Sequence, residues 1–319
     1  MSLQTSPLSS HLGVEITGVD LSSELDRATR DEITRVWIEH GVVLFRGAAV
    51  DDEVHMRLSR VFGELEPSAT ASMNNAQNPY MLDLRYDPEN EDPRFNQHYN
   101  VDGHDRAGYI GWHWDQAFMP TIVRGAVLRM VNPASEAGET GFVDAIRAHE
   151  RLPDDLKKRI EGLEVVYQFC GTMDANTFGV GQLKRLPRKV IPGKSSDRGF
   201  DFPAVVHPMV ITQMETGRKV LKFCPMHTPH VLGMDKDESH ELLAEVSSYL
   251  LDPTYMYFHK WQKDDMIVWD NWRIIHSAAG VPLNVSRYAK RTTIMGDYAV
   301  GRYLDPELDR NRQVSRIVD

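Results

Sequence analysis

The chain has 319 residues, with 36 lysines and arginines against 46 aspartates and glutamates, which gives a formal net charge of −10 and a sequence pI near 5.7. This acidic balance argues against a nucleic-acid partner, since nucleic-acid binding needs a basic face, and the sequence contains no apolar run long enough to cross a membrane. The N-terminus lacks the basic and apolar regions of a secretory signal, and the 2 cysteines cannot form a disulfide framework, so we expect a cytoplasmic protein.

The first third of the chain shows two helical patterns separated by a strand. Apolar residues at helical spacing predict a helix over 27–39 and another over 51–62, the second capped by Asp51. Between them, the apolar run Val42–Phe45 predicts a buried strand. Residues 68–109 are rich in Asn, Asp, Pro and Gly and show no clean period, so we expect a long loop with short elements. This loop leads into His113 and should lie beside the functional site.

The rest of the chain alternates short strands with helices. The pattern predicts strands over 123–131, 266–269 and 292–295, a helix within 146–160 that has a boundary near Leu152 or Pro153, and an amphipathic helix over 238–251. Residues 171–203 form a second irregular stretch, with basic clusters at Lys184-Arg185 and Arg188-Lys189. A solvated loop and a lid that closes over substrate are both open interpretations of this stretch.

Short strands dominate the second half, with helices before and between them. This order predicts a mainly β protein with flanking helices (α+β), of the double-stranded β-helix or jelly-roll type, also called cupin-like. No Gly/Ser- or Pro-rich linker divides the chain, so we expect a single domain over residues 1–319. We also expect a homo-oligomer that acts on a small molecule without a nucleic-acid or membrane partner.

Three residues in two motifs could bind one metal ion. His113 and Asp115 belong to Gly-Trp-His-Trp-Asp, and side chains two residues apart on a strand share a face. His276 follows far downstream and needs only to be near in space. Two imidazoles and one carboxylate on one side of a metal leave the other side open, as in non-haem Fe(II) oxygenases. A zinc hydrolase uses the same ligand types, so these residues alone leave both classes open.

The sequence around the distal histidine makes the interpretation more specific. Trp269-Asp-Asn precedes His276, and Arg287 and Arg291 follow it by eleven and fifteen residues. In these features the chain resembles the taurine dioxygenase and chlorophenoxyacetate dioxygenase family, which uses Fe(II) and 2-oxoglutarate. Further segments resemble the family over roughly residues 12–300, although the likeness is weakest in 68–109 and 171–203: they are Leu12–Leu21, Gly41–Gly47, Gly138-Glu-Thr140, His207-Pro, Thr216–Lys219 and Gly233-Met.

The resemblance implies a role for each site residue. His113, Asp115 and His276 would be the catalytic metal ligands, and Arg287 and Thr140 would bind the distal carboxylate of 2-oxoglutarate, since a guanidinium fork matches a carboxylate.

An even separation on an extended strand puts Arg291 on the same face as Arg287. In relatives that use sulfonates or aryloxy acids the matching arginine holds the anionic group of the substrate, so the resemblance implies this role for Arg291. Support of 2-oxoglutarate and contact with Asp115 are the alternatives.

The implied reaction oxidises, and by default hydroxylates, a C–H bond of a small organic, anionic substrate. Fe(II) would be the cofactor, 2-oxoglutarate and O₂ would be consumed, and succinate and CO₂ would be coproducts. A C–S, C–O or C–N bond could break if the oxidised carbon carries a heteroatom. Related halogenases have a small residue in place of the carboxylate ligand, so Asp115 argues against halogenation.

Two other classes compete with this interpretation: an enzyme that does not use 2-oxoglutarate, either a metal-dependent hydrolase or a cupin-type enzyme, and a non-catalytic metal-binding jelly-roll protein. Arg287 argues against the first, and the intact triad argues against the second.

Context gives weaker expectations for other polar and aromatic residues. We expect Trp269 and Trp272 to belong to the core, and Asn271 to brace the loop of His276. Four histidines in irregular segments are expected to be solvated: His98, His104, His227 and His230.

Overall fold

The computed structural model describes residues 3–47, 51–67, 75, 77–91, 97–173, 177–179, 181–187, 202–227, 229–296 and 299–310. Its largest sheet consists of β1 (Gln4–Pro7), β2 (Val14–Thr17), β3 (Val42–Phe45), β4 (Leu65–Glu66), β5 (Met81–Tyr86), β9 (Gly125–Asn132), β18 (Met266–Asp270) and β20 (Arg287–Ile294). The strand order is β1-β2-β3-β18-β9-β20-β4, and β5 also pairs with β20. β2 and β3 are parallel, and the other pairs of this sheet are antiparallel.

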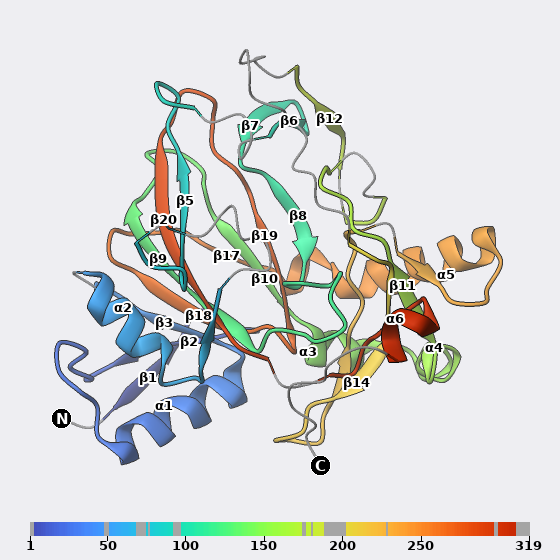
Figure 1. Cartoon of the computed structure of the whole chain (residues 1–319), viewed down its shortest axis with the longest axis horizontal. Coiled ribbons are helices and arrows are strands. Elements are labelled where there is room, and N and C mark those ends of the chain that lie inside the picture. Colours follow the sequence, from blue (N-terminus) through green and yellow to red (C-terminus); the bar gives the residue numbers. More distant parts are fainter. Residues whose placement is uncertain are drawn as a thin grey trace.

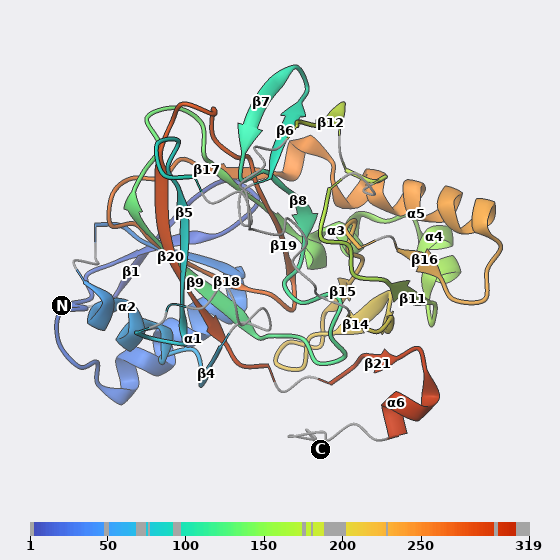
Figure 2. The same ribbon diagram turned by 45° about the horizontal axis from the view of Figure 1, so that its top comes forward.

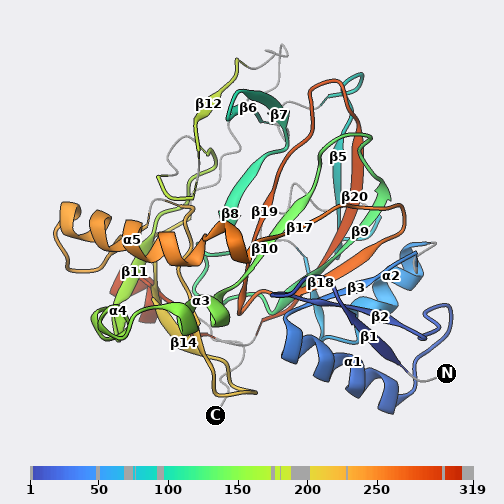
Figure 3. The same ribbon diagram turned by 180° about the vertical axis from the view of Figure 1, so that it is seen from behind.

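A second sheet lies beside the first and carries two of the predicted metal ligands (Figures 1 and 3). It consists, in order, of β17 (Tyr257–His259), β10 (Thr140–Asp144), β19 (Ile274–Ala278) and β8 (Ile110–His113). Phe142 of β10 and Ile274 of β19 share one buried cluster with Leu128 of β9 and Trp269 of β18. The two sheets therefore enclose a common apolar core, with β18 and β19 joined directly by the turn between them.

Smaller sheets and the helices surround these two sheets. The remaining strands are β6 (His98–Val101), β7 (His104–Ala107), β11 (Glu164–Tyr167), β12 (Leu183–Arg185), β13 (Val205–Pro208), β14 (Val210–Thr212), β15 (Lys219–Leu221), β16 (His230–Val231) and β21 (Arg302–Tyr303). The helices are α1 (Arg27–His40), α2 (Asp52–Ser59), α3 (Ala145–Arg151), α4 (Asp154–Ile160), α5 (Lys236–Leu250), α6 (Pro306–Arg310) and the 3₁₀ helix η2 (Pro253–Tyr255). β6, β7 and β12 stand together at one end of the molecule, away from α1 (Figure 2).

The helices bury opposite ends of the β framework. α1 packs Ile33, Val36 and Trp37 against the face of the large sheet that turns away from the second sheet. Strand β3 is buried on both sides, because Val43 and Phe45 face α1 while Val42 and Leu44 face the core between the sheets. A continuous apolar run is the pattern expected for such a doubly covered strand. α5 lies at the other end of the molecule and packs in the largest cluster (Figure 1).

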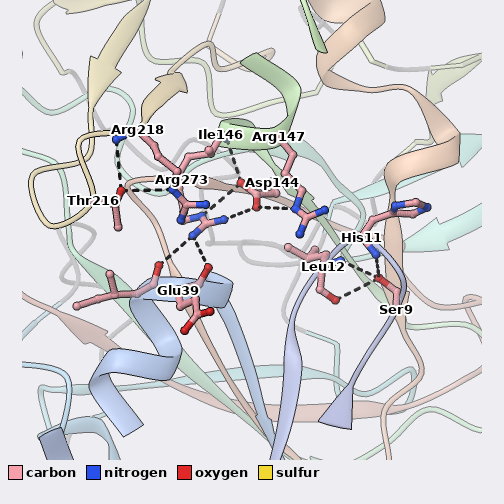
Figure 4. A network of polar contacts seen from close by, with 11 residues as sticks. Ser9, His11, Leu12, Glu39, Asp144, Ile146, Arg147, Thr216, Arg218 and Arg273 are labelled. Atoms are coloured by element: carbon pink, nitrogen blue, oxygen red, sulfur yellow. Dashed lines mark hydrogen bonds and ion pairs between the residues drawn. The ribbon is translucent and has the colours of Figure 1, made fainter. Parts of the chain in front are cut away.

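A buried ion pair fixes the turn that leads into β19. The guanidinium of Arg273 pairs with Asp144, and its Nη1 donates to the carbonyl oxygens of Ile38 (2.9 Å) and Glu39 (3.0 Å) at the end of α1 (Figure 4). Asp144 also caps α3 by accepting from the amide of Ile146 at 3.0 Å. One arginine thus joins α1, α3 and the strand that carries His276.

The structure confirms several predicted elements and corrects others. The helices near 27–39 and 238–251 and the strand Val42–Phe45 are confirmed. The predicted helix over 51–62 begins at the Asp51 cap as expected but ends at Ser59, because the amides of Val61 and Phe62 bond three residues back instead of four. The predicted helix within 146–160 is two helices, α3 and α4, which meet at Leu152-Pro153.

Residues 68–109, expected to be a long loop with short elements, contain three short strands in the part that the structure describes. β5, β6 and β7 lie there, and β5 pairs with six consecutive residues of β20, from Arg287 to Thr292. Leu82, Leu84 and Tyr86 alternate with charged residues, a short strand pattern inside a stretch that shows no clean period as a whole. The strand predicted over 292–295 is correspondingly longer, as β20. In the second irregular stretch, Lys184-Arg185 belongs to β12, while Arg188-Lys189 lie outside the described residues.

Within the described ranges, no helix is long and apolar enough to span a membrane.

Candidate active site

The side chains of His113, Asp115 and His276 meet where β8 ends. One ligand atom from each lies within 4.8 Å of the other two. His113 and His276 face each other in register across β8 and β19, with ring centroids 4.2 Å apart. β8 ends at His113, so Asp115 lies beyond the strand and its position does not follow from strand alternation as predicted. Other contacts must hold it in place.

Asn271 supplies those contacts. Its Oδ1 accepts from the amide of Asp115 at 2.7 Å, and its Nδ2 donates to the carbonyl oxygens of Asp115 and Val123, each at 3.1 Å. Asn271 was predicted to brace the loop of His276, and it holds the carboxylate-bearing turn as well. Sequence reasoning missed this second contact because the two residues are 156 positions apart.

The protonation states of the three side chains suit a metal ion. His113 Nδ1 lies 2.8 Å from the carbonyl of Gly111, so Nδ1 carries the proton and Nε2 keeps its lone pair. Burial lowers the pKa of His113 and lowers that of His276 well below its usual value. Burial alone would raise the pKa of Asp115, but Arg291 and the two histidines outweigh it and hold the pKa at about 2.

At neutral pH the group therefore offers two neutral imidazoles and one carboxylate, the forms that bind metal. These donor types, with no thiolate, fit Fe(II) with open coordination positions.

Arg287 is a half-buried cation that has no protein counter-ion in the described part of the chain. No carboxylate there lies within 4.0 Å of its guanidinium, and burial lowers its pKa to about 10. Gly138 approaches its side chain closely: with φ of +83°, a Cβ at this position would lie 3.4 Å from Arg287 Cδ and 3.1 Å from Val281. A guanidinium that is partly removed from water and unpaired is costly unless an anion binds it.

Thr140 begins β10 and is buried. Its Oγ1 accepts from the indole N–H of Trp261 at 3.0 Å. Since Oγ1 already accepts this bond, the hydroxyl proton is available to a second acceptor.

Arg291 faces the same space as Arg287, as strand periodicity predicted. Its Nη2 lies 2.8 Å from Asp115 Oδ2, and its guanidinium lies 5.4 Å from the centre of the Trp269 ring. Its Nε is buried and has no hydrogen-bond partner among the described residues. Contact with Asp115, one of the alternatives considered for this arginine, is thus present, while one N–H remains for a ligand.

All six predicted site residues line one cavity of about 620 Å³: His113, Asp115, Thr140, His276, Arg287 and Arg291. Residues from 82–87 and 107–110 also line it, which confirms that part of the first irregular stretch lies beside the site. The apolar wall includes Phe118, Phe169 and Met173.

Two expectations for the cavity wall need correction. His227 was expected to be solvated, but it is 5% exposed, lines the cavity, and accepts from the amide of Cys170 through Nδ1 at 3.2 Å. Burial lowers the pKa of His227 to about 3. Trp269 is buried as expected but also lines the cavity, where its ring lies 4.8 Å from that of His276.

The family model of the taurine catabolism dioxygenase TauD, TfdA family matches residues 4–293. The chain belongs to this family. An (S)-phenoxypropionate/alpha-ketoglutarate-dioxygenase of Sphingobium herbicidovorans is 29% identical over 294 residues, which cover 92% of this chain and 95% of that protein. An alpha-ketoglutarate-dependent 2,4-dichlorophenoxyacetate dioxygenase of Cupriavidus pinatubonensis is 27% identical over 310 residues, with 94% and 100% covered.

The TauD/TfdA fold is also found among solved structures. The crystal structure of a taurine dioxygenase from Burkholderia xenovorans matches with a TM-score of 0.71 at 24% sequence identity, covering 96% of this chain and 94% of that one. The resemblance inferred from the sequence is therefore confirmed, and the chain is a dioxygenase. The predicted cofactor set of Fe(II), 2-oxoglutarate and O₂ is that of alpha-ketoglutarate-dependent dioxygenases, to which the relatives belong.

Proposed function

We propose that this enzyme uses 2-oxoglutarate and O₂ to hydroxylate a C–H bond of a small organic anion, within a single domain of jelly-roll type. The observation that carries the proposal is the joining of two features in one cavity. Three side chains that can bind a metal line one part of the cavity, and the unpaired, half-buried guanidinium of Arg287 lines another. Fe(II), when held by His113, Asp115 and His276, supplies the activation of O₂ and the oxidation of substrate.

Arg287 and Thr140 would hold the far carboxylate of 2-oxoglutarate. Arg287 offers a planar pair of N–H donors, and Thr140 offers a hydroxyl proton that its bond from Trp261 leaves free. Burial strengthens these contacts, because little water competes for the carboxylate. The cosubstrate would thus be fixed at the end distant from its reacting keto acid.

Arg291 would serve both the triad and the substrate. Its Nη2 keeps Asp115 ionised and in place, while its buried Nε lacks a partner in the described part of the chain and can bind a carboxylate, sulfonate or sulfate group. The phenoxypropionate and dichlorophenoxyacetate named for the relatives are organic anions of this kind. An anion anchored there would fix which C–H bond meets the oxidant.

The reaction balances as one C–H bond, one 2-oxoglutarate and one O₂ giving one C–OH group, succinate and CO₂. If the new hydroxyl is on a carbon bonded to O, S or N, that bond can break to give a carbonyl group and release the heteroatom with a proton. Aromatic and apolar walls from Phe118, Phe169 and Met173 would exclude water around the reacting carbon.

A substrate screen tests the proposal. Purified enzyme would be supplied with Fe(II), ascorbate and 2-oxoglutarate, and succinate would be quantified with a panel of aryloxy, alkyl and sulfonated acids beside their methyl esters or amides. We expect acids to stimulate succinate formation and their uncharged analogues to do so poorly. Product formation without 2-oxoglutarate would instead support the hydrolase alternative, and stimulation by neutral compounds alone would refute the anionic substrate.

A further inference from the structure

Lys222 is a buried lysine that the proposed chemistry does not use. It follows β15, and its residue is 0% exposed. Lysine is rarely buried completely, because removing an ammonium group from water is costly unless other groups compensate it. A side chain of this kind in the centre of the protein calls for a specific reason.

The amine of Lys222 contacts two residues next to the Asp115 ligand: Asn271, which binds the Asp115 backbone, and Trp114, which precedes Asp115 in the chain. Nζ donates to the carbonyl oxygen of Asn271 at 2.5 Å. The side-chain amide of Asn271 is hydrogen-bonded to both the N–H and the carbonyl oxygen of Asp115. Nζ also lies 4.1 Å from the centre of the Trp114 ring, and Trp114 stands between His113 and Asp115 in the chain. One amine thus connects the turn before His276 with the turn that bears the carboxylate.

A salt bridge does not explain why the Lys222 amine is buried. In the described part of the chain no carboxylate oxygen lies within 4.0 Å of Nζ. The nearby carboxylate of Asp270 is engaged by Arg124 at 3.3 Å and by Gln213 at 3.2 Å. Burial lowers the pKa of Lys222 to about 7, against the attraction of Asp270. The hydrogen bond to the Asn271 carbonyl needs only an N–H, which the amine has in either protonation state.

Catalysis does not explain it either. Lys222 is not among the residues that line the cavity, whereas its neighbour Trp114 is. The amine lies behind the Trp114 ring and out of reach of a substrate in the cavity. Fold stability alone is a weak reason, because an apolar side chain of similar volume often stabilises a core as well as a buried ion does.

We infer that Lys222 is a positioning residue for the metal centre: it fixes the Asn271 turn against Trp114 and thereby holds Asp115 at its place opposite His113 and His276. This role rests on the proposed metal site. Groups that orient a ligand from behind typically change metal affinity by about 10- to 100-fold when removed. Lys222 would act through Asn271, at one step further from the metal.

Metal binding measured separately from activity tests the inference. Metal-free protein would be titrated with Co(II), and its visible ligand-field spectrum would report both affinity and coordination. The variant is Lys222→Met, which keeps the length of the side chain and removes the donor. Lys219→Met is the matched control, since Lys219 is an exposed lysine on the adjoining strand β15. Lys222→Arg is the conservative variant, which restores N–H donors over the Trp114 ring.

We expect Lys222→Met to bind Co(II) about 10-fold more weakly or worse, with an altered spectrum, while its metal-free melting temperature stays within a few degrees of the parent. Lys219→Met should match the parent, and Lys222→Arg should recover part of the lost affinity. Equal affinity and spectrum in Lys222→Met would overturn the inference. Failure of both Lys222 variants to fold would also overturn it, because the amine would then serve the fold. If the parent protein itself binds no Co(II), the metal site proposed above fails instead.

Discussion

Arg287→Ala should weaken 2-oxoglutarate binding more than any other single change away from the triad. The Arg287 side chain is half-buried and lacks a carboxylate within 4.0 Å in the described part of the chain, and its loss of contact with water lowers its pKa to about 10. It therefore remains a cation at neutral pH and has no protein partner to lose when it binds an anion. Removing a buried charge-assisted contact costs on the order of 2–4 kcal/mol, which corresponds to about a thirty- to a thousandfold loss of affinity.

Titration calorimetry of the Co(II)-loaded protein with 2-oxoglutarate measures this loss directly. Arg85→Ala is the matched control, because Arg85 also lines the cavity but its side chain is 62% exposed and pairs with Asp87 at 2.9 Å. We expect the control to change affinity by less than about threefold, as surface ion pairs contribute little. An Arg287→Ala protein that binds 2-oxoglutarate as tightly as the parent would show that the anchor lies elsewhere.

Three further predictions follow from the same contacts. Burial lowers the pKa of both triad imidazoles below the usual value of about 6.5, so both are neutral at pH 7. Calorimetry in two buffers should therefore find almost no proton release when Co(II) binds at pH 7. The affinity for Co(II) should fall only as the pH drops further. Asp144→Ala leaves the buried guanidinium of Arg273 without its carboxylate and should lower the free energy of unfolding by about 3–5 kcal/mol in urea, while the exposed control Asp154→Ala should change it little. Arg291→Leu should weaken binding of the organic acid found in the substrate screen and leave 2-oxoglutarate affinity nearly normal; a collapse of 2-oxoglutarate binding would reassign Arg291.

The site residues that could be predicted from the sequence are those that belong to short motifs. The spacing of His113 and Asp115, together with the resemblance of the segment around His276, Arg287 and Arg291 to the family, identified residues that the fold brings into one cavity. Two arginines on one strand share a face for a simple geometric reason, and β20 places them as expected.

The remaining features depend on contacts between distant segments. β5 pairs with β20, about 200 residues later. Its alternation of Leu82, Leu84 and Tyr86 with charged residues is a strand signal, but one too short to stand out in an otherwise irregular stretch. Contacts between distant segments also explain the hydrogen bonds of Asn271 to Asp115 and the burial of His227 and Lys222. In the sequence alone, each of these polar residues would be expected to lie in solvent. A single sequence does not reveal such burial, because polar side chains are exposed far more often than not.

The central claim is that the triad and Arg287 together assemble a metal and 2-oxoglutarate in one site. Anaerobic addition of 2-oxoglutarate to the Fe(II)-loaded protein tests it most directly, through visible absorption. The parent protein should develop a weak charge-transfer band that saturates with 2-oxoglutarate, and Asp115→Ala should develop none. A parent protein without the band, or a band of equal strength in Asp115→Ala, would contradict the assignment of this site.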